Sequence, residues 1–192
     1  MEWRQMKSEV KKRLPEKRYE HVLRVVDMAE RLADRHGISV KRAKKAALLH
    51  DVAKFMDREE LRRIVIDYGE DESVLDFHHE LWHAPAGAVI AREQFGIDDE
   101  RILDAIRYHT TGRANMTSLE KVIYIADLVE EGRTFPGADT LRQYAQTATL
   151  EKGMLESVRH TVRFLLEKRA QVHPDSLACY NEHVQLVRET KE

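Results

Sequence analysis

The sequence of 192 residues contains little cysteine, proline or glycine. Its single cysteine, Cys179, cannot form a disulfide within the chain, and one thiol cannot build a zinc cluster of several cysteines. Only 4 prolines and 8 glycines interrupt the sequence, and no long segment alternates apolar and polar residues as a half-buried strand does. These shortages disfavour a disulfide-stabilised fold and a β-sheet fold, and they favour helices.

Long apolar runs and a large net charge are missing as well. No run approaches the roughly 20 apolar residues that a membrane-spanning helix needs. Residues 1–14 are charged and lack the apolar segment of a signal peptide. Because 32 basic residues are balanced by 34 acidic ones, the net charge of −2 gives no broad basic surface for nucleic acid. We therefore expect a cytoplasmic protein with no membrane and no nucleic acid as partner.

Apolar residues recur at helical spacing along nearly the whole chain, which predicts an all-α fold. Pro15 and Gly37 mark the first turn and the end of the clearest helix. Ser39 and Asp57 are expected to cap the next two helices. The predicted helices cover residues 1–14, 15–36, 39–54, 57–69, 84–95, 99–109, 118–131, 138–148, 150–170 and 175–190.

No internal repeat or linker divides the chain, so we expect one domain over residues 1–192. Its core is expected at about 15–131, and helices at about 138–190 are expected to pack on this core. The first predicted helix carries an apolar face made of Trp3, Met6, Val10 and Leu14. This face fits either the core or a second subunit, so a homodimer remains open.

The segment 79–83, His-Glu-Leu-Trp-His, matches the H-E-x-x-H motif of zinc proteases. That motif needs a continuous helix through both histidines. Pro85 would clash with the carbonyl of Leu81 if such a helix continued, and Ala84 is shifted away from helical geometry because it precedes Pro85. Pro85 instead fits the first turn of a new helix, so the protease interpretation is disfavoured and the role of His83 stays open.

A second histidine motif, His50-Asp51, lies at the end of an apolar helix face rich in alanine. Burying an unpaired carboxylate beside that face would be costly. A cation bound by the imidazole and the carboxylate would relieve this cost. Lys54 follows one turn later, where it suits an anion held by the cation. The alternative is a surface His-Asp pair at the end of a helix.

Two further polar residues interrupt apolar helix faces. His21 lies in the apolar stripe of the helix predicted at 15–36, and Asp127 lies among apolar residues of the helix predicted at 118–131. A hydrogen-bonded core histidine and a structural salt bridge would also explain them, since a buried carboxylate needs a strong partner. With His50 and Asp51, however, they form the order His…His-Asp…Asp.

This order resembles the signature of the HD-domain metal-dependent phosphohydrolase superfamily. The segments HTTG (109–112), ADLVE (126–130), GRTFPG (132–137) and HPDSLACYN (173–181) further resemble the bacterial YqeK family. That family comprises symmetrical bis(5'-nucleosyl)-tetraphosphatases. The resemblance implies an HD-domain helical bundle with additional C-terminal helices, and cleavage of diadenosine tetraphosphate, a small dinucleoside polyphosphate, into two ADP. Another HD-domain phosphohydrolase, acting on nucleoside monophosphates, deoxynucleotides or guanosine tetraphosphate, and a non-catalytic helical module are the alternatives.

The resemblance also implies a divalent transition metal that generates a hydroxide nucleophile from bound water. It favours iron, although manganese, cobalt, nickel and zinc suit the same donors. The implied metal ligands are His21, His50, Asp51 and Asp127. His83 and His109 stand where relatives with two metals place extra histidines, so either one or two ions are expected. With one ion, these two histidines would contact phosphate or protonate the leaving group.

Catalysis of phosphoryl transfer also requires cations around the phosphates. Lys54 is the best-placed cation, and with Asp51, His83 and His109 it completes the expected catalytic residues. Arg18 and Arg133 are further candidates, although ordinary surface charge also explains Arg18. In the family, the segment corresponding to 170–175 lies over the nucleotide, but Asp175 also fits a helix N-cap. The expected substrate-binding residues are Arg18, His21, Lys54, His83, His109, Thr110, Asp127, Arg133, Ala170, Gln171, Val172, His173, Pro174 and Asp175.

Overall fold

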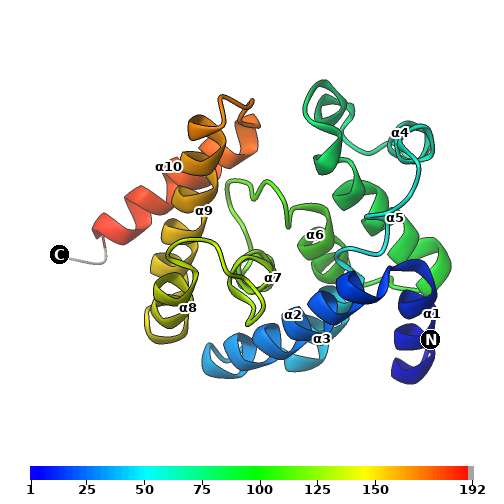
Figure 1. Cartoon of the computed structure of the whole chain (residues 1–192), viewed down its shortest axis with the longest axis horizontal. Coiled ribbons are helices and arrows are strands. Elements are labelled where there is room, and N and C mark those ends of the chain that lie inside the picture. Colours follow the sequence, from blue (N-terminus) through cyan, green and yellow to red (C-terminus); the bar gives the residue numbers. More distant parts are fainter. Residues whose placement is uncertain (190–192) are drawn as a thin grey trace.

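The computed structural model describes residues 1–189, which fold into a set of α-helices without a β-strand in that range (Figure 1). The α-helices are α1 (Trp3–Arg13), α2 (Glu16–Arg35), α3 (Val40–Leu49), α4 (Arg58–Asp67), α5 (His83–Phe95), α6 (Glu100–Arg107), α7 (Ser118–Val129), α8 (Ala138–Thr147), α9 (Leu150–Glu167) and α10 (Pro174–Glu189). The predicted all-α fold class is confirmed. The final predicted position, residue 190, lies outside the described residues.

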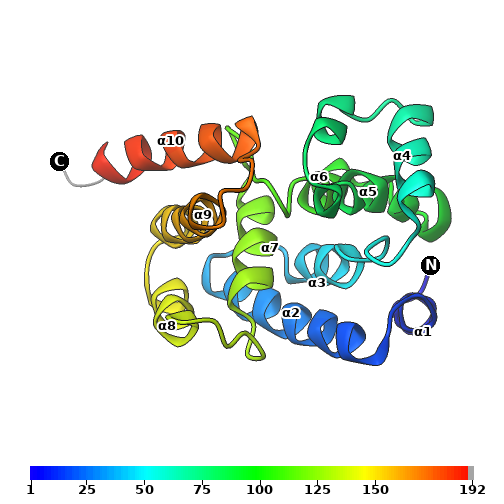
Figure 2. The same ribbon diagram turned by 45° about the horizontal axis from the view of Figure 1, so that its top comes forward.

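Helix α7 occupies the centre of the molecule (Figure 2). It packs on α2, α3 and α6 on one side and on α8 and α9 on the other. Its residues are apolar around nearly the whole circumference, and Val122, Ile123 and Ile125 are buried on different faces. A helix of this composition is stable only when it is covered on all sides. The C-terminal helices therefore complete the burial of α7.

Helix α1 packs within the chain. Its side chains Met6 and Val10 are fully buried, Leu14 is nearly so, and α1 contacts α2 and α3. Trp3 packs at the edge of the same core, with the Lys44 ammonium over its ring. The apolar face of the first helix thus belongs to the core of the chain. Within residues 1–189, no helix combines the length and the apolarity that crossing a membrane requires.

Several details of the helices differ from prediction. Helix α3 ends at Leu49 rather than at residue 54, and the chain continues in tight turns in which Val52 N–H donates to Leu49 O and Lys54 N–H to Asp51 O. The 3₁₀ helices Glu72–Asp76 and His79–Leu81 were not predicted, because such short turns carry no hydrophobic period. Asp175 is not an N-cap; α10 begins at Pro174, and the Asp175 N–H donates to the His173 ring.

The loop between α6 and α7 is held against α10. Ser176 on α10 donates a hydrogen bond to the carbonyl of Thr111 at 2.8 Å. The next residue, Gly112, has φ +65°, and a Cβ atom added there would lie 2.9 Å from the Sγ atom of the buried Cys179. This close approach fixes α10 to the segment that directly follows His109.

This contact predicts a specific loss of stability in Gly112→Ala. Gly37 provides a matched control, because its φ is +66° and a Cβ there would have no neighbour within 4 Å. Gly37→Ala should lower the free energy of unfolding by about 1–2 kcal/mol, the strain of an alanine at positive φ. Gly112→Ala should lose about 1–3 kcal/mol more because the added methyl overpacks the α10 contact. Urea unfolding measures both values, and equal losses would contradict the proposed contact.

Candidate metal centre

Four histidines and two aspartates from separate helices meet at one place. They are His21 on α2, His50 and Asp51 at the end of α3, His83 at the start of α5, His109 after α6, and Asp127 on α7. Five of them are buried, and the Asp127 side chain is 23% exposed. All six residues that the sequence predicts as ligands of a first or second metal therefore lie together.

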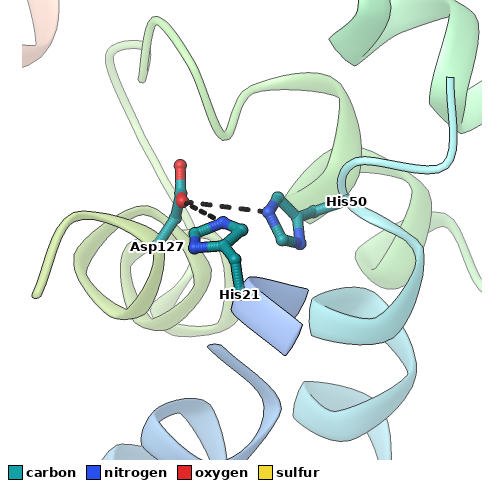
Figure 3. A group of neighbouring side chains, drawn as sticks. All are labelled: His21, His50 and Asp127. Atoms are coloured by element: carbon teal, nitrogen blue, oxygen red, sulfur yellow. Dashed lines mark ion pairs between the residues drawn. The ribbon is translucent and has the colours of Figure 1, made fainter. Parts of the chain in front are cut away.

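One group consists of His21, His50 and Asp127, whose side chains point toward one another from α2, the end of α3 and α7 (Figure 3). The Nε2 atoms of His21 and His50 lie 3.1 and 3.8 Å from Asp127 Oδ1. They also lie 3.6 and 3.1 Å from Oδ2 of Asp51. These nitrogen and carboxylate oxygen atoms are the donors that first-row transition metals accept.

Two atoms of this group and one of the neighbouring Asp51 support the fit to a metal directly. His21 Nε2, His50 Nε2 and Asp51 Oδ2 are buried and make no hydrogen bond of acceptable geometry with any residue in the described range 1–189. Buried polar atoms without a hydrogen bond cost about 1–3 kcal/mol each, so proteins rarely leave them so. A cation held between these three atoms would satisfy them, and the residues present therefore fit a bound divalent metal.

The second group lies on the other side of Asp51. Its Oδ1 atom is 3.1 Å from His83 Nε2 and 3.9 Å from His109 Nε2, and these two nitrogens are 3.1 Å apart. Oδ2 of the same carboxylate faces His21 and His50. Asp51 therefore lies between two sets of imidazole nitrogens, with one oxygen directed to each.

Backbone carbonyls fix three of the four imidazole rings. The Nδ1 atoms of His50, His83 and His109 donate to the carbonyls of Ala47, Glu80 and Ile106, at 2.6, 2.6 and 2.7 Å. Because a carbonyl oxygen can only accept, the proton must be on Nδ1 in each neutral ring. Each Nε2 then keeps its lone pair for a metal. His50 and His109 follow the ends of α3 and α6, and His83 follows the 3₁₀ helix His79–Leu81, so each uses a carbonyl from the end of the preceding helix, where carbonyl groups lack partners within the helix.

The neighbouring imidazole and guanidinium groups keep the two aspartates of the site in the protonation state that binds metals. Burial opposes ionisation of Asp51, but the neighbouring His50 and His83 hold the pKa of this carboxyl well below its usual range. Burial likewise opposes ionisation of Asp127, but His21, His50 and Arg133 keep its pKa low. Both carboxylates are therefore ionised at neutral pH.

The two histidines of the second group are neutral at the same pH. Burial lowers the pKa of His83. Burial, together with repulsion from His50 and His83 whenever those rings carry a proton, lowers the pKa of His109 to about 3. Burial also opposes protonation of His50, but the Asp51 carboxylate raises the pKa of His50 above its usual value. Neutral imidazoles and ionised carboxylates are the forms that bind metals.

Two predicted cations contact the carboxylates of the site. Arg18 Nε lies 2.9 Å from Asp51 Oδ2, so Arg18 faces the site instead of carrying an ordinary surface charge. Arg133 donates from Nη2 to Asp127 Oδ1 at 2.7 Å and from Nε to the Asp127 carbonyl at 2.9 Å. Lys54 instead pairs with Glu80 at 2.5 Å, in a hollow of about 250 Å³ that His83 also lines.

A larger cavity of about 500 Å³ is lined by the chain neighbours of His109, Tyr108 and Thr110, but not by the six residues of the metal groups themselves. Its walls include Tyr108, Thr110 and Thr111 after α6, together with His173 and Asp175 from the segment predicted to lie over a nucleotide. Ala170 and Gln171 of that segment are exposed to solvent. Only part of the predicted segment 170–175 therefore lines this cavity. Sequence reasoning missed Tyr108, whose ring face is covered by the Arg113 guanidinium at 4.1 Å.

The two histidines of the H-E-x-x-H segment do not share a site. His79 lies in a 3₁₀ helix, where its ring neighbours those of His78 and Trp82. His83 is the first residue of α5, with Pro85 in the first turn, and its Nε2 faces Asp51 and His109. The side chains of a zinc protease motif would converge, so this geometry agrees with rejecting that interpretation.

Comparison with known proteins gives the same family that the His…His-Asp…Asp order resembles. The family model of the HD domain matches residues 18–132. Proteins named symmetrical bis(5'-nucleosyl)-tetraphosphatase from Bacillus subtilis and Staphylococcus aureus are 46% and 41% identical to this chain. The matches cover 90% and 89% of this chain, and 92% and 89% of the relatives.

A solved structure has the same fold. A crystal structure described as a predicted HD superfamily hydrolase from Clostridium acetobutylicum aligns with a TM-score of 0.90 and 38% identity. The alignment covers 96% of this chain and 98% of the other. The His…His-Asp…Asp residues, the helical fold and these relatives agree, and the chain belongs to the HD-domain family and, within it, to the family of bacterial symmetrical bis(5'-nucleosyl)-tetraphosphatases.

Proposed function

We propose that this protein is a metal-dependent hydrolase that cleaves diadenosine tetraphosphate symmetrically and releases two molecules of ADP. One observation carries the proposal. Four histidines and two aspartates converge in a chain that is 46% identical, over 90% of its length, to a symmetrical tetraphosphatase. The donor set supports metal-assisted hydrolysis, and the relatives indicate the substrate and the bond that is cleaved.

The position of Asp51 supports two ions per chain. His21, His50 and Asp127 would hold one, His83 and His109 the other, and Asp51 would contribute one carboxylate oxygen to each. Iron is the metal that the family resemblance favours, while manganese, cobalt, nickel and zinc suit the same donors. A bound divalent metal supplies an activated water and neutralises phosphate charge.

Basic side chains around the two groups would bind the rest of the tetraphosphate. Arg18 and Arg133 already contact the carboxylates Asp51 and Asp127, so their guanidinium groups lie next to the place where a phosphate would sit. Lys54 lies on the other side, beside His83. Cations on both sides would stabilise the charge on the phosphoryl oxygens in the transition state.

The cavity beside His109 is the proposed place for one of the two nucleosides. Thr110 would offer a hydroxyl to a phosphate or ribose near the metal groups, and His173 and Asp175 would contact the nucleoside farther along the wall. At about 500 Å³, the cavity lies in the range of roughly 300–1,000 Å³ that small-molecule sites occupy. The exposed Ala170 and Gln171 remain predicted contacts of the segment that precedes His173.

Product analysis by chromatography tests the reaction. The purified protein, supplied with iron or manganese, should convert diadenosine tetraphosphate to ADP alone, and a chelator should abolish the conversion. AMP together with ATP would contradict the site of cleavage. Turnover of other nucleotides without turnover of diadenosine tetraphosphate would instead favour another HD-domain phosphohydrolase.

Asp51→Asn should lower both metal content and turnover, because the neutral amide removes the carboxylate shared by both groups. We expect kcat/KM to fall by at least about 100-fold, in line with the role of metals in charge stabilisation. Metal content is measured by plasma emission spectrometry, and turnover by ADP release. Asp27→Asn on the exposed side of α2 is the control and should match the unmodified protein. A non-catalytic helical module instead predicts no stoichiometric metal and no turnover, both in the unmodified protein and in the two variants.

The number of ions is tested by His83→Ala. The unmodified protein should bind two manganese ions per chain, and the variant about one, because it keeps the three side chains of the first group and the shared Asp51. Equilibrium dialysis with manganese measures the stoichiometry. One ion in the unmodified protein would contradict the two-ion proposal and assign His83 and His109 to the substrate.

A further inference from the structure

Glu130 is a buried carboxylate that the sequence analysis did not assign. It directly follows α7, three residues after Asp127, and is 1% exposed. Its Oε1 atom lies 3.1 Å from Nδ1 of His21, the ring nitrogen that faces away from Asp51 and Asp127. Glu130 thus contacts a predicted metal ligand from behind, and no predicted role accounts for the cost of burying its charge.

His21 differs from the other three histidines of the site in its place on a helix. His50, His83 and His109 lie at helix ends and use the carbonyl three residues earlier to fix Nδ1. His21 lies within α2, where the carbonyls of the preceding turn already accept backbone N–H groups. A side chain from elsewhere must therefore supply the acceptor for its Nδ1, and Glu130 is in that position.

We infer that Glu130 is a positioning residue that orients the His21 ring and strengthens metal binding through it. The inference rests on the metal site of the proposed function. A carboxylate that accepts the Nδ1 proton fixes the tautomer and makes Nε2 a better donor to a metal. The Nε2 lone pair of His21 would then point towards Asp127 and Asp51, and like the other three rings His21 would keep its proton on Nδ1.

The surroundings of Glu130 hold its carboxylate in place. Oε2 accepts hydrogen bonds from Arg24 Nε and from the Gly132 N–H, both at 2.5 Å. The Arg24 guanidinium lies directly over Gly132, where an added Cβ would meet Nε at 2.5 Å. One oxygen is therefore anchored while the other is left for His21.

A purely structural role would give Glu130 different properties. In that case the Arg24–Glu130 pair would only tie the end of α7 to α2, and its loss would lower stability without changing the affinity for metal. The neighbouring residues offer a control of this kind. Arg31, on the same helix as Arg24, pairs with Glu131 at 2.9 Å at the surface, with both side chains about half exposed.

The test compares Glu130→Gln with Glu131→Gln. Isothermal titration calorimetry of the metal-free proteins with manganese gives the dissociation constant. Thermal unfolding without metal gives the melting temperature as a measure of stability. Glu130→Gln should weaken binding at the first group by about 10- to 100-fold, the usual cost of losing such a partner. Glu131→Gln should bind manganese as the unmodified protein does. A lower melting temperature with unchanged affinity for manganese would overturn the inference.

Arg24→Gln keeps the test decisive if Glu130→Gln fails to fold. This variant leaves Glu130 in the chain but removes its anchor, so manganese binding should weaken in the same direction, while Arg31→Gln should leave it unchanged. Equal affinity in the two arginine variants would overturn the inference. Because manganese binding is measured without substrate, failure of the inference is distinguishable from failure of the unmodified protein to cleave diadenosine tetraphosphate.

Discussion

Asp51 and Asp127 carry negative charge in the interior of a small helical protein, and the arrangement of the site follows from the need to compensate that charge. Burial alone would favour neutral carboxyl groups, yet the pKa of each is held low by imidazoles and guanidinium groups from other helices. The compensation is incomplete, because Asp51 Oδ2 and the Nε2 atoms of His21 and His50 make no hydrogen bond of acceptable geometry among residues 1–189. A divalent cation held between these atoms would complete it.

Helix ends determine where the compensating groups lie. Helix α3 stops at Leu49, and the free carbonyls of its last turn allow His50 to turn its Nε2 toward the carboxylates. His83 and His109 likewise donate from Nδ1 to the backbone carbonyl three residues earlier, so the same type of hydrogen bond orients three of the four rings. His21 lies in the interior of a helix, where no backbone carbonyl is free to accept from its Nδ1. The buried Glu130 behind its ring supplies this acceptor instead.

The sequence predicts the parts of this structure that depend on local pattern. Apolar periodicity, Pro15 and Gly37 identify most of the helices, and His21 and Asp127 are conspicuous as polar residues on apolar faces. The end of α3 was placed too late because nothing in residues 50–54 breaks a helix locally. The sequence does not predict the contact of Glu130 with His21, because the two residues lie 109 positions apart and such a contact produces no periodic pattern in the sequence. Tyr108 is not predicted for the same reason, since the cavity that it lines is formed together with His173 and Asp175, which lie far along the chain.

The central position of α7 limits where the chain can be truncated without exposing its core. The HD domain match ends at residue 132, but Met154 and Val158 of α9 are fully buried and α9 packs on α7. A fragment that ended at residue 132 would expose an apolar side of the helix that carries Asp127, and it would be prone to self-association. We therefore expect the cooperative folding unit to extend beyond the boundary of the family match, and the proposed metal ligand Asp127 to depend on helices that contribute no ligand.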